Sequence, residues 1–284
     1  MRLSALLVAL LVAGCGDAVV PAGSAVDARV AEATERLSAS EAGQRVLAAI
    51  DAHGGLDAWY GGGPLAFRYT YTRLDSTGAD ADNAIDTRQT VDTWAARAVH
   101  TLADDPAVSF GWTGEQAWQS PPGASLPTRA RFWSLTPYYF VGMPFVLADP
   151  GVRTALAAPD TVEGARVDVV RVTFEPGTGD APDDYYDLLL DPASDRVRGV
   201  RYVVSHPGIM PAGGHTPETL MLYDGAQTVA GEAGDIVLQA GFRSFLSADG
   251  TPKARGTLSE VAFVPETPAD AFALPDGAEV LRGM

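Results

Sequence analysis

LAFRYTYTRLD, residues 65 to 75, is the stretch from which the fold is most directly predicted. Apolar and polar side chains alternate along it: Leu65, Phe67, Tyr69 and Tyr71 are separated by Ala66, Arg68, Thr70 and Thr72. A strand with one buried face has this period of two, because successive side chains point to opposite faces of a sheet. The stretch therefore predicts a β-strand, and the same period continues through most of the chain after Pro64.

Turn-forming clusters of Pro, Gly and Asp divide the remaining chain into further strands. We expect strands over residues 88–100, 109–112, 115–119, 166–175, 185–190, 197–205, 220–229, 236–246 and 257–265. The turn at 191–195 would join a tyrosine-rich strand to the strand that holds Tyr202 as a hairpin. Together these segments predict a long antiparallel meander, and a mainly β (α+β) fold class.

The residues before Pro64 follow a helical period instead. Apolar side chains at Val30, Leu37, Val46, Leu47 and Ile50 predict two short helices over 27–37 and 40–52, or one helix kinked at 38–40. Ser40 is the expected N-cap of the second helix, and the glycines at 54 and 55 would end it. One further helical turn would carry Trp59 before the chain enters the sheet.

A segment rich in aromatic residues, TRARFWSLTPYYFVGMPFVLADPG (128–151), interrupts the alternation. Pro137 and Pro144 prevent a single long helix there. Two interpretations remain open: the insert plugs one end of the sheet core, or it forms a short helical lid that encloses an apolar cavity. For the second, the candidate ligand-binding residues are Trp59, Phe67, Tyr69, Phe132, Trp133, Tyr139, Phe140, Met143 and Phe145.

The N-terminus carries SALLVALLVAGCGDAVV (4–20), whose apolar core is far shorter than the ~20 residues of a membrane-spanning helix. Residues 1–14 therefore read as a signal peptide. The tetrapeptide Val12-Ala13-Gly14-Cys15 resembles the lipobox of bacterial lipoproteins, which implies acylation of Cys15 with chains such as palmitate. Cys15 is the single cysteine, so it has no partner for an internal disulfide. Residues 15–26 would form a flexible tether, and the resemblance favours the outer membrane because Asp17 lies one place beyond the inner-membrane retention position.

The composition limits the possible partners and the number of domains. Removal of Arg2 with the signal peptide changes the net charge from −16 to −17. Such a chain repels phosphate backbones, so we expect no nucleic-acid partner. The hydrophobic content of 46% supplies a substantial core, and we expect residues 27–284 to form one β-rich domain.

Several local stretches resemble the LolA/LolB-like lipoprotein carrier fold and a group of uncharacterised lipoproteins with that fold. They are AIDAHGGLDAW (49–59), RFWSL with YYFVGMPFVL (131–147), and DDYYDLLLDPASDRVRGVRYVVS (183–205). The resemblance implies an incomplete β-barrel with N-terminal helices and a helical insert across its mouth, enclosing an apolar hollow for acyl chains. It implies no catalytic residue.

Motifs for catalysis, cofactors or metals are not found in the sequence. There is no Gly-x-Ser-x-Gly, no phosphate-binding Gly-x-x-x-x-Gly-Lys and no dinucleotide fingerprint. His206 and His215 flank a Pro/Gly-rich loop, but no third metal ligand accompanies them. The acidic clusters at 75–86 (Asp75, Asp80, Asp82, Asp86) and 180–184 (Asp180, Asp183, Asp184) do not match the calcium-binding loop, so we expect solvated surface there.

The sequence thus predicts a membrane-tethered, periplasm-facing lipoprotein that binds an acyl chain or another apolar ligand without catalysis, cofactor or metal. The alternative is an interaction module whose barrel is filled by its own side chains and whose surface docks an envelope protein. A hydrolase that uses His206 or His215 ranks third, because neither histidine has an evident nucleophile.

Overall fold

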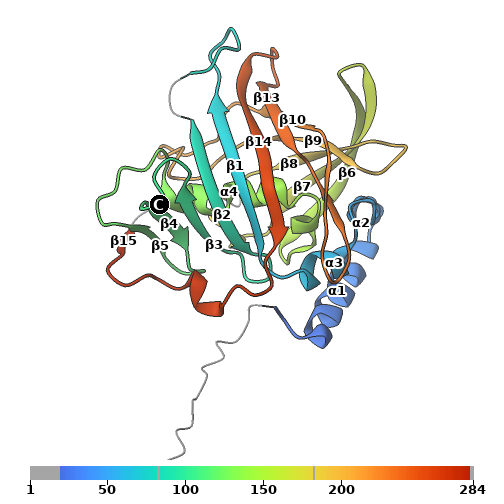
Figure 1. Ribbon diagram of the computed structural model, residues 1–284. Coiled ribbons are helices and arrows are strands. Elements are labelled where there is room, and N and C mark those ends of the chain that lie inside the picture. Colours follow the sequence, from blue (N-terminus) through green and yellow to red (C-terminus); the bar gives the residue numbers. More distant parts are fainter. Residues whose placement is uncertain (1–19, 82–83, 182, 282–284) are drawn as a thin grey trace, which may run out of the picture.

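The computed structural model describes residues 20–81, 84–181 and 183–281. Thirteen strands form one antiparallel sheet in the order β15-β5-β4-β3-β2-β1-β14-β13-β10-β9-β8-β7-β6. The sheet curves around helix α4 (Figure 1), and its two end strands do not pair with each other. The prediction of a mainly β fold with an incomplete barrel is therefore confirmed. The signal peptide and Cys15 lie outside the described residues.

The strands are β1 (Leu65–Arg73), β2 (Ile85–Asp92), β3 (Arg97–Leu102), β4 (Ser109–Trp112), β5 (Ala117–Ser120), β6 (Val152–Val162), β7 (Ala165–Phe174), β8 (Tyr186–Leu190), β9 (Val197–Tyr202), β10 (Thr219–Asp224), β13 (Gly241–Leu246), β14 (Pro252–Phe263) and β15 (Glu279–Leu281). A separate hairpin consists of β11 (Gln227–Val229) and β12 (Ile236–Leu238). The helices are α1 (Gly23–Ser38), α2 (Glu41–Ala52), α3 (Leu56–Gly61) and α4 (Ala130–Val141), with 3-10 turns η1 (Phe145–Ala148) and η2 (Ala269–Phe272).

Strand β1 confirms the alternation in the sequence. Leu65, Phe67 and Tyr69 are buried, while the residues between them are half-exposed. β1 pairs with β2 on one side and with β14 on the other. The segment that begins the predicted meander therefore lies at the centre of the sheet, although its second neighbour comes from the C-terminal part of the chain.

Several predicted strand boundaries are wrong. The segment 88–100 contains two strands, β2 and β3, joined by a turn in which Ala96 has a φ of +49°. The segments 220–229 and 236–246 are likewise each divided in two, and β14 begins at Pro252 rather than at 257. Between β2 and β3 the apolar pattern continues through the turn, so periodicity gives no signal for that break. Between β10 and β11 the dipeptide Asp224-Gly225 is a turn signal that the prediction overlooked.

Two strands were not predicted. β6 is the sheet's edge strand and contains Ala155, Ala157, Ala158 and Pro159, which have weak strand propensity. It pairs with β7, and a bulge lies between Ala157 and Asp160. β15, at the other edge, covers three residues of the described part of the chain.

The N-terminal helices agree with the helical period of the sequence, with one correction. Ser40 caps α2 as predicted, since its side chain accepts a hydrogen bond from the Gly43 amide at 3.0 Å. However, α1 begins at Gly23, so residues 23–26 belong to the helix and not to the predicted tether. Val26 is buried there, and this apolar contact extends the helix toward the N-terminus.

Arg29 fixes α1 against the end of the sheet. Its guanidinium lies 4.3 Å from the ring centre of Tyr60 and 4.6 Å from that of Trp94, and it also pairs with Asp149 at 2.9 Å. Cation–π contacts of this kind stabilise most where water is excluded. Among the described residues, no helix is both long enough and apolar enough to cross a membrane.

Candidate functional site

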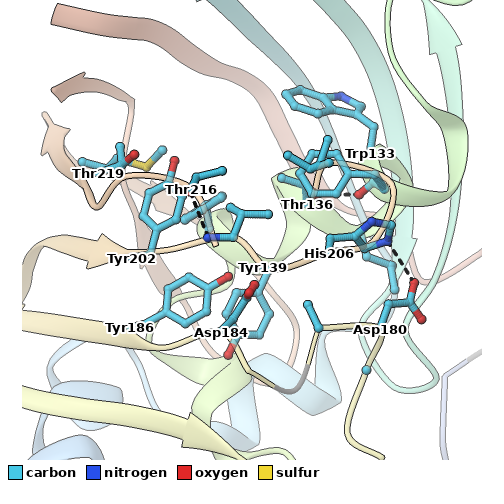
Figure 2. A pocket seen from close by; sticks show the side chains of 18 of the residues that line it. Trp133, Thr136, Tyr139, Asp180, Asp184, Tyr186, Tyr202, His206, Thr216 and Thr219 are labelled. Carbon is cyan, nitrogen blue, oxygen red and sulfur yellow. Dashed lines mark hydrogen bonds and ion pairs between the residues drawn. The ribbon is translucent and has the colours of Figure 1, made fainter. Parts of the chain in front are cut away.

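A cavity of about 380 Å³ lies between helix α4 and the concave face of the sheet. Strands β1, β8, β9 and β10 supply one wall, and the loops 175–184 and 203–218 border it (Figure 2). A volume of this size falls within the roughly 300–1,000 Å³ of typical small-molecule sites. The barrel is therefore not completely filled by its own side chains. The interaction-module alternative had expected a filled barrel.

Helix α4 contributes one continuous face to this cavity. Phe132, Leu135, Thr136, Tyr139 and Phe140 all line it. Their spacing of three or four residues places them on one side of a helix. Val141 and Tyr138, on the opposite side, belong to the main core. The insert therefore combines the two interpretations that the sequence left open. One side of α4 completes the core, and the other side covers the cavity.

Five tyrosines make the cavity wall aromatic. Tyr139 lies 5.2 Å from Tyr186 between ring centres, and Tyr186 stacks on Tyr202 at 5.8 Å. Tyr69 and Tyr71 complete the set from β1. Burial raises the pKa of Tyr69, Tyr139 and Tyr186 well above the usual value, so their hydroxyls stay neutral. The wall therefore offers large apolar surfaces with hydroxyl groups at their edges.

Two polar atoms of tryptophan and tyrosine side chains in this wall are buried without a hydrogen-bond partner in the described part of the chain. They are Nε1 of Trp133 and the hydroxyl of Tyr139, and both are buried. A buried donor without a partner costs free energy, on the order of 1–3 kcal/mol. Both residues line the cavity, but these two atoms are not exposed to it.

Charged groups of the loop 175–184 and of α4 pair with one another at one end of the cavity. Arg131 pairs with Asp180 at 2.7 Å, and Nε2 of His206 lies 3.4 Å from the same carboxylate (Figure 2). Asp184 accepts hydrogen bonds from the amide and the hydroxyl of Ser205 at 2.5 and 2.7 Å. Burial raises the pKa of Asp184, although these hydrogen bonds oppose the shift. These contacts tie the two bordering loops together.

A lysine lines the cavity at the start of β14. Nζ of Lys253 donates a hydrogen bond to Oγ1 of Thr219, the first residue of β10, at 2.6 Å. Lys253 is half-buried, and this burial lowers its pKa. It is the single lysine of the chain.

The structure separates the predicted ligand-binding residues into two groups. Five of the nine line the cavity: Tyr69, Phe132, Trp133, Tyr139 and Phe140. The other four, Trp59, Phe67, Met143 and Phe145, are buried in the core and do not line it. Trp59 and Phe145 stack on each other at 4.6 Å, with planes 5° apart. These four were predicted because they have large apolar side chains, and in the structure those side chains pack in the core.

Sequence reasoning missed several lining residues, among them Tyr71, Tyr186, Tyr202, His206, Met221 and Lys253. A signal existed for Tyr186, because it shares a strand face with Leu188 and Leu190, which are buried in the main core. Lys253 and Met221 had no such signal. They reach the cavity because β13 pairs with both β10 and β14, and this order of strands could not be predicted from the sequence.

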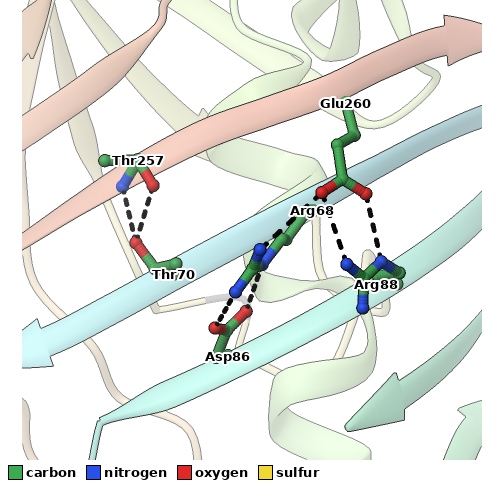
Figure 3. A network of polar contacts seen from close by, with 6 residues as sticks. All are labelled: Arg68, Thr70, Asp86, Arg88, Thr257 and Glu260. Atoms are coloured by element: carbon green, nitrogen blue, oxygen red, sulfur yellow. Dashed lines mark hydrogen bonds and ion pairs between the residues drawn. The ribbon is translucent and has the colours of Figure 1, made fainter. Parts of the chain in front are cut away.

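Several of the histidines and aspartates considered as metal ligands make other contacts. His215 is exposed and its Nδ1 lies 2.9 Å from the carbonyl of Thr216. Asp86 pairs with Arg68, and Arg88 pairs with Glu260, in a row of polar contacts across β2, β1 and β14 (Figure 3). Within residues 20–81, 84–181 and 183–281, no three His, Cys, Asp or Glu side chains group as metal ligands. Asp82 lies outside these ranges.

Comparisons with known proteins assign the fold. No protein-family model matches the chain, and no curated protein matches it. Among solved structures, the chain is similar to a LolA superfamily protein from Nitrosomonas europaea, with 10% identity, a TM-score of 0.52, and 81% of this chain and 97% of that one covered. It is also similar to a DUF1329 family protein from Desulfovibrio piger, with 10% identity, a TM-score of 0.53, and 81% and 96% covered.

A third similar structure is a domain ascribed to outer-membrane lipoprotein sorting, from Vibrio parahaemolyticus. Its identity is 11%, its TM-score is 0.50, and the match covers 82% of this chain and 97% of that one. At such identities the likeness concerns the fold alone. The chain has a LolA-like fold, as its local sequence resemblances implied.

Proposed function

We propose that this protein is a lipid-anchored protein of the cell envelope that binds an acyl chain or a similar apolar ligand in the cavity under α4. The observation that carries the proposal is the cavity itself, which is lined by aromatic rings from α4 and the sheet. The LolA-like fold supports it, because a solved structure with that fold is ascribed to lipoprotein sorting. Concave apolar sites with a few polar groups are where small ligands usually bind.

The proposal includes attachment through acylated Cys15, a periplasm-facing body and a non-enzymatic role. The single cysteine at the end of the apolar leader supports the anchor. The mainly aromatic and aliphatic lining of the cavity supports binding of an apolar ligand. Incorporation of a palmitate analogue into the wild type, and not into Cys15→Ser, tests the anchor.

Binding is tested on residues 19–284, exported without Cys15, by native mass spectrometry and lipid extraction. The decisive variant is Thr136→Trp, because Thr136 lines the cavity from α4 and an indole there would occupy it. The matched control is Thr34→Trp, which makes the same change at an exposed position of α1.

We expect a lipid to co-purify with the wild type and with Thr34→Trp, and to be lost from Thr136→Trp. Equal binding by all three proteins would place the ligand elsewhere. A wild type that carries no lipid and takes up no apolar fluorescent probe would refute the proposal and favour the alternative, an envelope protein docked on the outer surface.

A further inference from the structure

Two basic side chains, Arg131 and Lys253, line the cavity besides His206, and they differ in their partners. Arg131 is neutralised by Asp180 and also lies 3.7 Å over the ring of Trp112. Lys253 forms no ion pair with any carboxylate of the described residues, and its hydrogen bond goes to a hydroxyl. An ammonium group has three N–H donors, so Lys253 keeps two for another acceptor.

The surroundings of Lys253 make an anion a favourable partner. Thr219, its hydrogen-bond acceptor, is 1% exposed, so the ammonium sits partly out of water. Burial without a nearby carboxylate lowers the pKa of Lys253, whereas an opposite charge would raise it. Lys253 also borders the aromatic wall, since its partner Thr219 pairs with Tyr202 of the neighbouring strand β9.

We infer that Lys253 binds the anionic head group of an amphiphile whose apolar chain lies against the aromatic wall. This inference rests on the proposed function and names the chemical class of its ligand: a chain that ends in a carboxylate or a phosphate. The net charge of −16 repels anions from the protein as a whole. A half-buried ammonium at the cavity therefore distinguishes an acidic amphiphile from a neutral one of the same length.

The experiment compares dodecanoic acid, dodecyl phosphate and 1-dodecanol as ligands of residues 19–284. Charge-assisted hydrogen bonds in partly buried sites should make the acid bind roughly tenfold or more tightly than the alcohol. Lys253→Met should remove this difference mainly by weakening the binding of dodecanoic acid, while Lys253→Arg should keep the preference for the acid. Tighter binding of dodecyl phosphate than of dodecanoic acid would assign a phosphate head group.

A second readout needs no substitution, because the chain has one lysine. Reductive methylation with ¹³C-formaldehyde converts Lys253 and the terminal amine to dimethylamines, which keep the positive charge but only one N–H. NMR then follows each signal during titration and reports on the charge of Lys253. Dodecanoic acid should shift the Lys253 signal and raise its pKa, and 1-dodecanol should not raise it.

The two levels of the proposal fail differently. Equal affinities for acid and alcohol, unchanged in Lys253→Met and with no rise in the pKa of Lys253, would overturn the inference while the cavity remains a lipid site. Binding of none of the three ligands by the wild type would overturn the proposed function itself.

Discussion

Acidification from pH 7 to pH 5 should destabilise this protein through His100. Its side chain is fully buried, stacks on Phe110 at 4.6 Å, and places Nε2 2.9 Å from the carbonyl oxygen of Ser134. Nε2 therefore carries the proton in the neutral ring and donates it to that carbonyl. Nδ1 is buried without a hydrogen-bond partner in the described residues, so a second proton there would create an unsatisfied charge.

The size of the effect follows from the pKa of His100, which burial lowers from 6.5 to about 4. The unfolded chain binds the proton near pH 6.5 and the folded chain only near pH 4, so the unfolded state gains stability as the pH falls between these values. Linkage over the interval from pH 7 to pH 5 gives a loss of about 2 kcal/mol in the free energy of unfolding. His53, whose pKa burial also lowers, adds in the same direction.

Urea unfolding followed by circular dichroism at several pH values measures this loss. His100→Gln keeps an N–H donor for the Ser134 carbonyl but cannot titrate, so its stability should fall about 2 kcal/mol less than that of the wild type. His215→Gln is the matched control, because His215 is exposed, and it should keep the wild-type dependence. Identical pH profiles for the wild type and His100→Gln would refute the reasoning.

Three further substitutions separate capping, core packing and close strand approach. Ser40→Ala removes the hydrogen bond to the Gly43 amide and should lower the free energy of unfolding by about 1 kcal/mol in urea titrations; no change would mean that the cap is replaced. Phe145→Leu loses the stack on Trp59 and should cost about 1–3 kcal/mol while dodecanoic acid affinity stays unchanged; lost affinity at unchanged stability would return Phe145 to the binding site. Gly256→Ala would place a methyl group 2.1 Å from a backbone oxygen of β1 and should lower the unfolding temperature by several degrees, on the order of 2–4 °C per kcal/mol; an unchanged temperature would contradict this contact.

The sequence predicts the class of fold well because alternation is a local property. β1, the Ser40 cap and the interrupting helix follow from spacing within a few residues. β6 escapes the same reasoning, since its alanines and Pro159 resemble a loop and its strand geometry depends on pairing with β7.

The candidate site is predicted less completely for a related reason. Size and apolarity identify Tyr139 and Phe145 equally, but only the packed structure directs one to a cavity and the other onto Trp59. Lys253 joins the site through partners far away in the sequence, because β14 lies near β10 by way of β13. Tertiary pairing, and not local propensity, determines which side chains meet.

The two edge strands of the sheet influence whether molecules of this protein aggregate at high concentration. An edge strand offers free backbone groups to which another molecule can add a strand, and long flat edges of this kind lead to aggregation. Within the described residues, β15 spans three residues at one of these edges. β6 is longer, but its proline and its bulge between Ala157 and Asp160 interrupt the row of backbone groups that a second chain would need. An open sheet can thus keep its hollow accessible without inviting strand exchange between neighbouring molecules.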